Sequence, residues 1–266
     1  MNHEYEFDVC VVGAGRVGLP WAVVMAASGY DVVCVDVDEE VVEAVNDGEL
    51  PWPEPGVGER LENAYDAGRI RATTDPAVVA DAQVVGFCLY CKREGIDTYL
   101  SIVADYAAHI DPDQIVVNRS TLPLSVVDEA RARIAEGVGV APGELRYVVF
   151  PERTGVGEVV RDMENHPAII GTSDEGARET MEEVFASTLR PRWYTLDEHS
   201  AMFVKLIDNS YRDAVFALAN YYVVLADAYD LPVDGSRLVR IAEDGYKNDI
   251  YLPGPVGGKC LLKDSY

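Results

Sequence analysis

A glycine-rich turn near the N-terminus constrains the fold of this chain more than any other feature of its sequence. An apolar segment, Phe7–Val12, runs directly into GAGRVG at residues 13–18, and a helix-like stretch follows over residues 19–28. A second apolar segment, residues 31–35, ends at Asp36. The order of strand, glycine turn, helix, strand and acidic residue is typical of a dinucleotide-binding unit.

The residues of this turn each have a physical role. Gly13 permits the tight turn, Gly15 lets the backbone approach a pyrophosphate, and Gly18 lets the helix pack closely on the sheet. The free N–H groups and the positive dipole end at the start of the helix would face the phosphates. Arg16 and Val17, which complete the turn, therefore belong to the predicted cofactor site.

Asp36 indicates which dinucleotide the unit prefers. Its carboxylate can accept hydrogen bonds from a ribose 2′-hydroxyl and would repel a 2′-phosphate, so we expect NAD rather than NADP. The alternative is a glycine turn between strand and helix that binds no ligand, and the matching context disfavours it.

Strand and helix patterns alternate as far as residue 196. We expect further strands at residues 69–73, 83–89, 114–117, 145–150 and 192–195, and helices at residues 39–46, 97–110, 124–135 and 174–187, with one more helix ending near residue 67. Strands separated by helices imply a parallel sheet with helices on both faces. The predicted fold class is therefore α/β, a Rossmann-like doubly wound parallel sheet that forms an NAD-binding domain over residues 1–196.

A different pattern begins at residue 197. Residues 198–229 contain no glycine or proline, which predicts one helix much longer than the average of about 12 residues. A shorter helix is expected to end near Glu243. We therefore predict a second, helical domain over residues 197–266, with the long helix as an inter-domain spine or a homodimer interface. Its apolar row belongs either to a core or to an interface, and comprises Ala217, Leu218, Tyr221, Tyr222 and Leu225.

The charge of the chain excludes some partners. Asp and Glu number 46 against 22 Lys and Arg, which gives a formal net charge of −24. So negative a chain repels nucleic acid and anionic membranes. The acidity is spread along the chain, which favours adaptation to high salt over the alternative of an ordinary acidic protein. No run of about 18 apolar residues predicts a membrane span, and the acidic N-terminus is unlike a signal peptide, so we expect a cytoplasmic protein.

Four of the five cysteines offer little chemistry. Cys10, Cys34 and Cys88 lie in apolar strand-like runs, where a thiol usually acts as a small buried hydrophobe. Cys88 and Cys91 form a CxxC, but no second pair or nearby histidine completes a metal site, so we predict no metal. Cys260 differs because it lies in the glycine-rich segment PGPVGGKC.

Candidate site residues occur in four places. Ser120-Thr121 and Pro151-Glu152 each follow a predicted strand, at the carboxyl ends where α/β sites form. Lys205 and Asn209 are four residues apart on the long helix and so share a face. Cys260 and Asp264 lie close together near the end of the sequence.

Each candidate also has a structural alternative. Ser120-Thr121 could simply cap the next helix, and Glu152 could pair with the side chain of Arg153 on the surface. Lys205 could be solvated instead of lying beside an anionic group, and Cys260 could be a structural thiol. Together, a thiol, an amine, an amide and two carboxylates would complete an oxidising site beside NAD.

Several motifs carry a resemblance to a known family. In order along the chain they read GAGRVGLPWA, VDVD, PWPEPGVGERL, GRIRATTD, RSTLP, PER, VKLIDNSYRD and GGKCLLKD. This series resembles the UDP-glucose/GDP-mannose dehydrogenase family over nearly the whole sequence. The PER and PGP-GG-C variants look nearer to its UDP-N-acetylhexosamine branch.

The resemblance implies an NAD-dependent oxidoreductase acting on CH–OH donors, which takes a sugar C6 alcohol through an aldehyde to a carboxylate. By analogy Cys260 would attack the aldehyde, and oxidation of the thiohemiacetal would give a thioester. Lys205 and Asn209 would stabilise the oxyanion. Asp264, Thr121 and Glu152 would organise water and move protons, with Thr121 also touching the cofactor.

The sequence departs from the family pattern in several segments. CLYCKREG stands in place of a CVPTP-like segment, PLSV in place of PPGT, and Leu262 in place of a proline, while PGPVGGKC is one residue shorter than its counterpart. The family's third, C-terminal α/β domain has no counterpart in the sequence. Two alternatives therefore stay open: a non-catalytic NAD-binding relative with a regulatory or scaffold role, and a two-electron 3-hydroxyacid-type dehydrogenase that would not need Cys260.

Overall fold

The computed structural model describes the chain except for residues 1–4, 156, 189–191, 245–249 and 256–266. By its contacts the chain divides into two compact units, Met1–Phe203 and Val204–Tyr266. The domain boundary that we predict from the sequence, after residue 196, stays a prediction.

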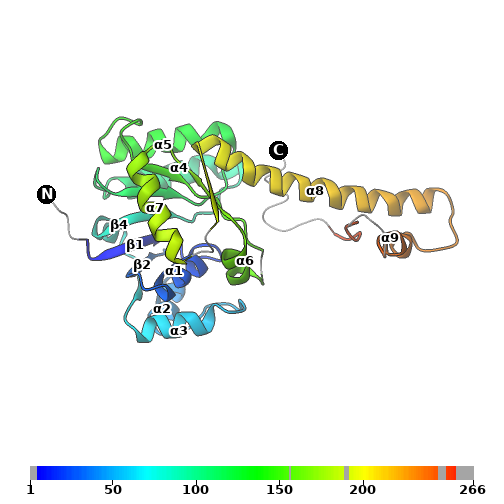
Figure 1. Cartoon of the computed structure of the whole chain (residues 1–266), viewed down its shortest axis with the longest axis horizontal. Helices are drawn as coiled ribbons and strands as arrows, with labels where there is room; N and C mark the ends of the chain where they lie inside the picture. The colour runs from blue at the N-terminus through cyan, green and yellow to red at the C-terminus, as the bar shows by residue number, and fades with distance from the viewer. Residues whose placement is uncertain (1–4, 156, 189–191, 245–249, 256–266) are drawn as a thin grey trace. The chain divides into compact units, whose positions relative to one another are not determined.

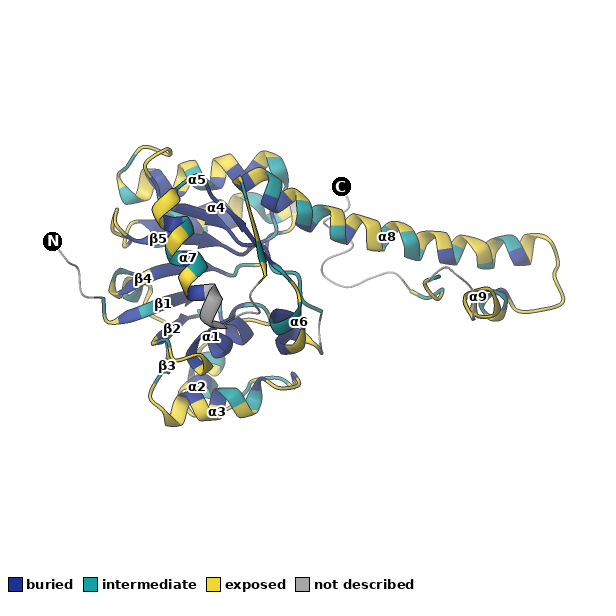
Figure 2. Ribbon diagram, viewed as in Figure 1, coloured by how far each residue is buried: buried dark blue, intermediate teal, exposed yellow. Residues whose placement is uncertain are grey.

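The first unit is built around an eight-stranded sheet with the strand order β3-β2-β1-β4-β5-β6-β7-β8. Its strands are β1 (Phe7–Val12), β2 (Val32–Val35), β3 (Ile70–Thr73), β4 (Ala82–Phe87), β5 (Ile115–Asn118), β6 (Tyr147–Val149), β7 (Ala168–Gly171) and β8 (Trp193–Leu196). β1, β2 and β5–β7 are almost entirely buried (Figure 2), as expected for strands covered on both faces.

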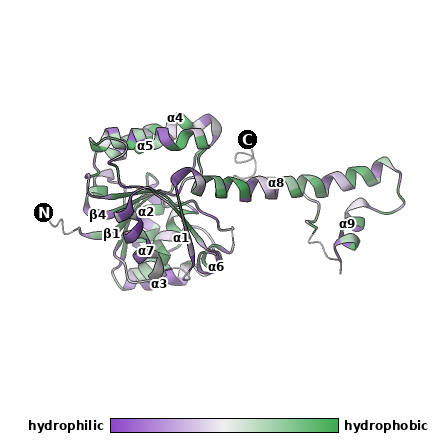
Figure 3. Cartoon of the chain, turned by 45° about the horizontal axis from the view of Figure 1, so that its top comes forward, coloured by the Kyte–Doolittle hydropathy of each residue, from purple (hydrophilic) through white to green (hydrophobic). Residues whose placement is uncertain are grey.

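Helices cover both faces of this sheet (Figures 1 and 3). α4 (Ile96–Ala107) and α5 (Leu124–Val138) lie on one face. The other face carries α1 (Gly18–Ala27), α2 (Glu39–Asn46), α3 (Gly58–Asp66), α6 (Val159–Asn165) and α7 (Glu175–Thr188). Two 3-10 turns, η1 (Pro76–Asp81) and η2 (Arg93–Gly95), flank β4. The α/β, doubly wound fold predicted from the sequence is confirmed.

The sheet differs from the prediction in one place. Among the described strands every neighbouring pair is parallel except β6 and β7, which meet antiparallel through Val149 and Gly171. The sheet is thus mostly parallel, as predicted, and the one antiparallel pair was not expected because no sequence pattern predicts α6 or β7. These elements have only seven and four residues, too few for a clear hydrophobic period.

The register brings the ends of the central strands together. Val12 of β1 pairs with Phe87 of β4, which pairs with Asn118 of β5, which in turn pairs with Val149 of β6. The residues that follow these strands therefore meet at one edge, the carboxyl edge of the sheet. This edge is where ligands bind in open α/β sheets.

The second unit contains most of α8 (Glu198–Ala228) together with α9 (Gly235–Glu243). α9 packs closely on α8, because a Cβ added at Gly235 would lie 2.8 Å from the Cα of Val223. Asn220 exchanges two hydrogen bonds of 2.8 Å with the backbone of Gly254. The single long helix expected from residues 198–229 is confirmed.

We predict that Gly86→Ala destabilises the first unit. A Cβ at Gly86 of β4 would lie 2.3 Å from Cζ3 of Trp21 on α1, and such overpacking costs about 1–3 kcal/mol. Urea unfolding would measure the loss. Gly143→Ala is the matched control, because a Cβ there would meet nothing within 4 Å in the described structure. An unchanged free energy of unfolding for Gly86→Ala would contradict this packing.

Candidate active site

The glycine turn after β1 has the geometry that the sequence predicts. Gly13 has a φ of +93°, and a Cβ there would lie 2.9 Å from the carbonyl oxygen of Cys88. A Cβ at Gly18 would lie 1.9 Å from the carbonyl oxygen of Gly13. Around Gly15, by contrast, no described atom lies within 4 Å of an added Cβ. The turn is thus closed beneath Gly13 and Gly18 and open at Gly15, where a pyrophosphate would approach.

The start of α1 is suited to an anion. Among the described residues no side chain caps this helix, and its first turn holds no acidic residue. α2 begins differently, because Asp38 accepts a hydrogen bond from the N–H of Glu40 and Glu39 adds a second acid. Uncapped N–H groups at a helix start bind phosphate well.

Asp36 lies at the end of β2 and faces the glycine turn. Its carboxylate accepts a hydrogen bond of 2.7 Å from the N–H of Ala14 and one of 3.1 Å from the N–H of Asp38. Each carboxylate oxygen keeps a lone pair for a ribose hydroxyl. Arg16, also in the turn, places its guanidinium 5.3 Å from the ring centre of Trp52. These residues fit NAD, which would supply the hydride acceptor.

The residues after β5 tie two strands together. The Oγ of Ser120 accepts a hydrogen bond from the N–H of Leu89 and donates one to the carbonyl of Phe87. No described side chain caps α5, whose N-cap position is Pro123. The hypothesis that Ser120-Thr121 merely caps the next helix is therefore wrong. Thr121 is half-buried at the same edge of the sheet.

Glu152 follows β6 and is held by both of its oxygens. Oε1 accepts the N–H groups of Arg153 and Thr154 at 2.8 and 2.9 Å, and Oε2 pairs with the guanidinium of Arg119. The hypothesis of a surface pair with the side chain of Arg153 is wrong, because the partner comes from the end of β5. Arg119 directly precedes Ser120-Thr121, yet no local pattern in the sequence predicts its role.

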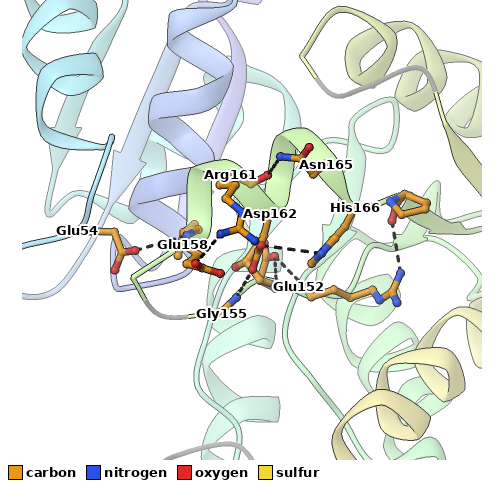
Figure 4. A network of polar contacts seen from close by, with 12 residues as sticks. Glu54, Glu152, Gly155, Glu158, Arg161, Asp162, Asn165 and His166 are labelled. Atoms are coloured by element: carbon orange, nitrogen blue, oxygen red, sulfur yellow. Dashed lines mark hydrogen bonds and ion pairs between the residues drawn. The ribbon is translucent and has the colours of Figure 1, made fainter. Parts of the chain in front are cut away.

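Two further carboxylates fasten the loop after β6 (Figure 4). Asp162 accepts the N–H of Gly155 at 2.8 Å. Glu54, in the PWPEPG segment, accepts the N–H groups of Gly157 and Val159 at 2.8 and 3.4 Å. Both carboxylates belong to buried residues. A pocket opens beside this loop, lined among others by Trp21, Arg119, Phe150, Glu152, Arg153, Asp162 and His166.

Three of the described cysteines, Cys10, Cys34 and Cys88, are poor nucleophiles. Burial raises the pKa of the Cys88 thiol to about 12, despite the nearby Arg119 guanidinium, which lowers it. Burial also raises the pKa of Cys10 and Cys34. These thiols stay protonated near neutral pH, whereas the thiolate is the reactive form.

The remaining candidates lie in the second unit or beyond the described residues. Lys205 and Asn209 are one turn apart on α8, and both are buried, so the hypothesis of a solvated Lys205 is wrong. Cys260 and Asp264 lie outside the described residues, and their roles stay predictions. In the part of the chain that the structure describes, no helix is long and apolar enough to cross a membrane.

The chain is similar to known proteins over most of its length. Residues 7–189 match the NAD binding domain of the UDP-glucose/GDP-mannose dehydrogenase family. The UDP-N-acetyl-D-mannosamine dehydrogenase of Pyrococcus horikoshii is 32% identical over 97% of this chain and 63% of its own length. That of Methanococcus maripaludis is 30% identical over 100% of this chain and 62% of its own.

A solved structure extends the likeness. The UDP-D-ManNAc dehydrogenase structure from Pyrococcus horikoshii superposes with a TM-score of 0.87 at 28% identity, covering 97% of this chain and 62% of that one. The chain thus spans a little under two thirds of the length of these relatives.

We predict that Gly15→Ala and Gly18→Ala separate NAD binding from folding. The Gly15 variant should unfold as the wild type does but bind NAD roughly tenfold or more weakly, because its methyl group occupies the space of the pyrophosphate. The Gly18 variant should lose about 3 kcal/mol of stability, because its methyl group overlaps the backbone of Gly13. Calorimetric titration and urea unfolding measure the two effects. Wild-type NAD affinity in Gly15→Ala would contradict the phosphate position.

Proposed function

Because the chain belongs to the UDP-glucose/GDP-mannose dehydrogenase family, we propose that it is an NAD-dependent nucleotide-sugar 6-dehydrogenase. The observation that carries this proposal is the open, uncapped start of α1 beside Asp36, with Thr121 and Glu152 at the same edge of the sheet. The relatives are named for UDP-N-acetyl-D-mannosamine, so UDP-N-acetylhexosamines are the substrates that we favour, ahead of UDP-glucose.

The proposed reaction converts the C6 alcohol, one water and two NAD⁺ into a carboxylate, two NADH and three protons. After the first oxidation, the sulfur of Cys260 bonds to the aldehyde carbon and gives a thiohemiacetal. Lys205 and Asn209 donate hydrogen bonds to its oxygen. The second oxidation gives a thioester, and water cleaves its C–S bond. Glu152, Thr121 and Asp264 orient that water and take up its proton.

Two alternatives make different demands on the same residues. A two-electron 3-hydroxyacid-type dehydrogenase would use Lys205 and Asn209 but not Cys260. A regulatory or scaffold relative would bind NAD through the turn at residues 13–18 and turn over nothing. The buried Lys205 and Asn209 favour an enzyme over this last alternative.

We expect two NADH per nucleotide sugar under saturating NAD, with Cys260→Ser abolishing formation of the acid. The assay compares UDP-glucose, UDP-N-acetylglucosamine and UDP-N-acetylmannosamine in concentrated KCl, because salt screens the repulsion within a chain of net charge −24. Cys91→Ala, which changes a buried thiol at another position, should keep the wild-type rate.

Other results would identify the alternatives. One oxidation per substrate that survives Cys260→Ser would favour the two-electron dehydrogenase. NAD binding without NADH from any sugar would overturn the enzymatic proposal.

We also propose a cytoplasmic homodimer formed through α8. Leu218, Tyr221 and Tyr222 are 49%, 54% and 45% exposed within a chain whose other large apolar side chains are mostly buried, and exposed apolar rows of this kind commonly mark protein interfaces.

Replacing Leu218 and Tyr221 together by Glu should convert the dimer to a monomer, because each subunit would bring two unpaired charges into the interface. Sedimentation in the analytical ultracentrifuge measures the mass. Tyr194→Glu is the control, since Tyr194 is 54% exposed on β8, outside α8. A monomeric wild-type chain would refute the dimer.

A further inference from the structure

Arg119 is a buried cation held between two aromatic rings. The residue is 3% exposed, and its guanidinium carbon lies 4.4 Å from the ring centres of both Trp21 and Phe150. The guanidinium therefore makes two cation–π contacts, an arrangement that suits arginine better than lysine. A cation enclosed in this way costs desolvation free energy that its partners must offset.

The edge of the guanidinium makes an ion pair with Glu152. Nη2 of Arg119 donates to Oε2 of Glu152, and the two side chains are 2% and 12% exposed. The Nε and Nη1 atoms are buried and have no hydrogen-bond partner among the described residues. Most buried donors in proteins are paired, so these two unpaired donors lower the stability of the fold. The hydrogen bonds that Arg119 makes among the described residues go to the Glu152 carboxylate.

The enclosure also limits what Arg119 can touch. Arg119 borders the pocket, but its side chain is only 2% exposed and packs against two rings, so it offers a substrate or cofactor almost no surface. Its effect on any reaction must pass through a neighbour. Glu152 is that neighbour, because it lines the pocket and its other oxygen is already fixed by the N–H groups of Arg153 and Thr154.

A continuous set of contacts links Glu152 to the cofactor helix. Gly86 of β4 leaves room for Trp21 against the sheet. Trp21 lies on α1, the helix that begins at the glycine turn, and its ring stacks on Arg119. The position of the Glu152 carboxylate is thus set relative to the helix that would hold the NAD phosphates.

We propose that Arg119 is a positioning residue, which orients the Glu152 carboxylate for its work on water and protons. This inference rests on the proposed function, in which Glu152 is a catalytic residue. Arg119, which directly precedes Ser120-Thr121, thus affects the reaction through Glu152.

A double-mutant cycle on kcat tests the proposal. Arg119→Met should lower kcat by about 10- to 100-fold, because a misdirected catalytic group costs this much, while the KM for NAD changes less than threefold. Arg119→Lys should recover part of the loss, since an ammonium group still pairs with the carboxylate. In a Glu152→Gln background, Arg119→Met should add less than a threefold effect.

A matched variant controls for the loss of a partly buried ion pair. Arg131 pairs with Glu198 at 3.2 Å in the same unit, so Arg131→Met removes a similar interaction away from Glu152. It should leave kcat within twofold of the wild type. Independent, multiplying effects of Arg119→Met and Glu152→Gln on kcat would overturn the proposal, as would equal losses in Arg119→Met and Arg131→Met.

A second readout does not depend on turnover. The same cycle, measured on the unfolding equilibrium constant in urea, should show at least a tenfold coupling between Arg119 and Glu152. If the wild type oxidises no nucleotide sugar, the proposed function fails, and this coupling alone decides whether Arg119 holds Glu152. Effects that multiply within twofold would overturn it. If Arg119→Met does not fold, Arg119→Gln, which is uncharged and cannot form the ion pair, replaces it in both cycles.

Discussion

The close approach of Gly18 to Gly13 is the contact on which the described site depends. A side chain at Gly18 would lie 1.9 Å from the carbonyl oxygen of Gly13, so a hydrogen atom at this position is what lets α1 start directly against the sheet. Nine of the ten α1 residues are buried as a result. The same approach aims the uncapped N–H groups of the helix at the carboxyl edge, and it brings Trp21 over Arg119.

The carboxyl edge is held in place largely by charged groups that lie under the surface. Glu54 and Asp162 accept backbone N–H groups from the loop after β6, and Arg119 fixes Glu152 from the end of β5. Carboxylates bound to backbone donors or to arginine avoid the penalty of an unpaired buried charge. The overall charge of −24 thus has two parts: a large solvated surplus and a few acids that shape the site.

Several parts of this arrangement could be read from the sequence. The turn at residues 13–18, Asp36, and the positions of Thr121 and Glu152 after their strands follow from local patterns, because hydrophobic period and glycine spacing act within one or two elements. The ion-pair partner of Glu152 could not be predicted in the same way. Pairing with Arg153 is the obvious choice from neighbouring positions, yet Arg119 is the partner, 33 residues earlier.

The sequence by itself determined the β1–α1–β2 unit, its preference for NAD, the long helix α8 and the series of motifs that indicates the family. Each of these depends on residues close together along the chain. Only the tertiary structure decided that β7 runs antiparallel to β6, that Glu54 holds a loop 103 residues away, and that Arg119 lies between two rings. These features depend on which elements meet in space. Strand register and side-chain packing decide which distant elements come into contact, and no local sequence pattern specifies these contacts.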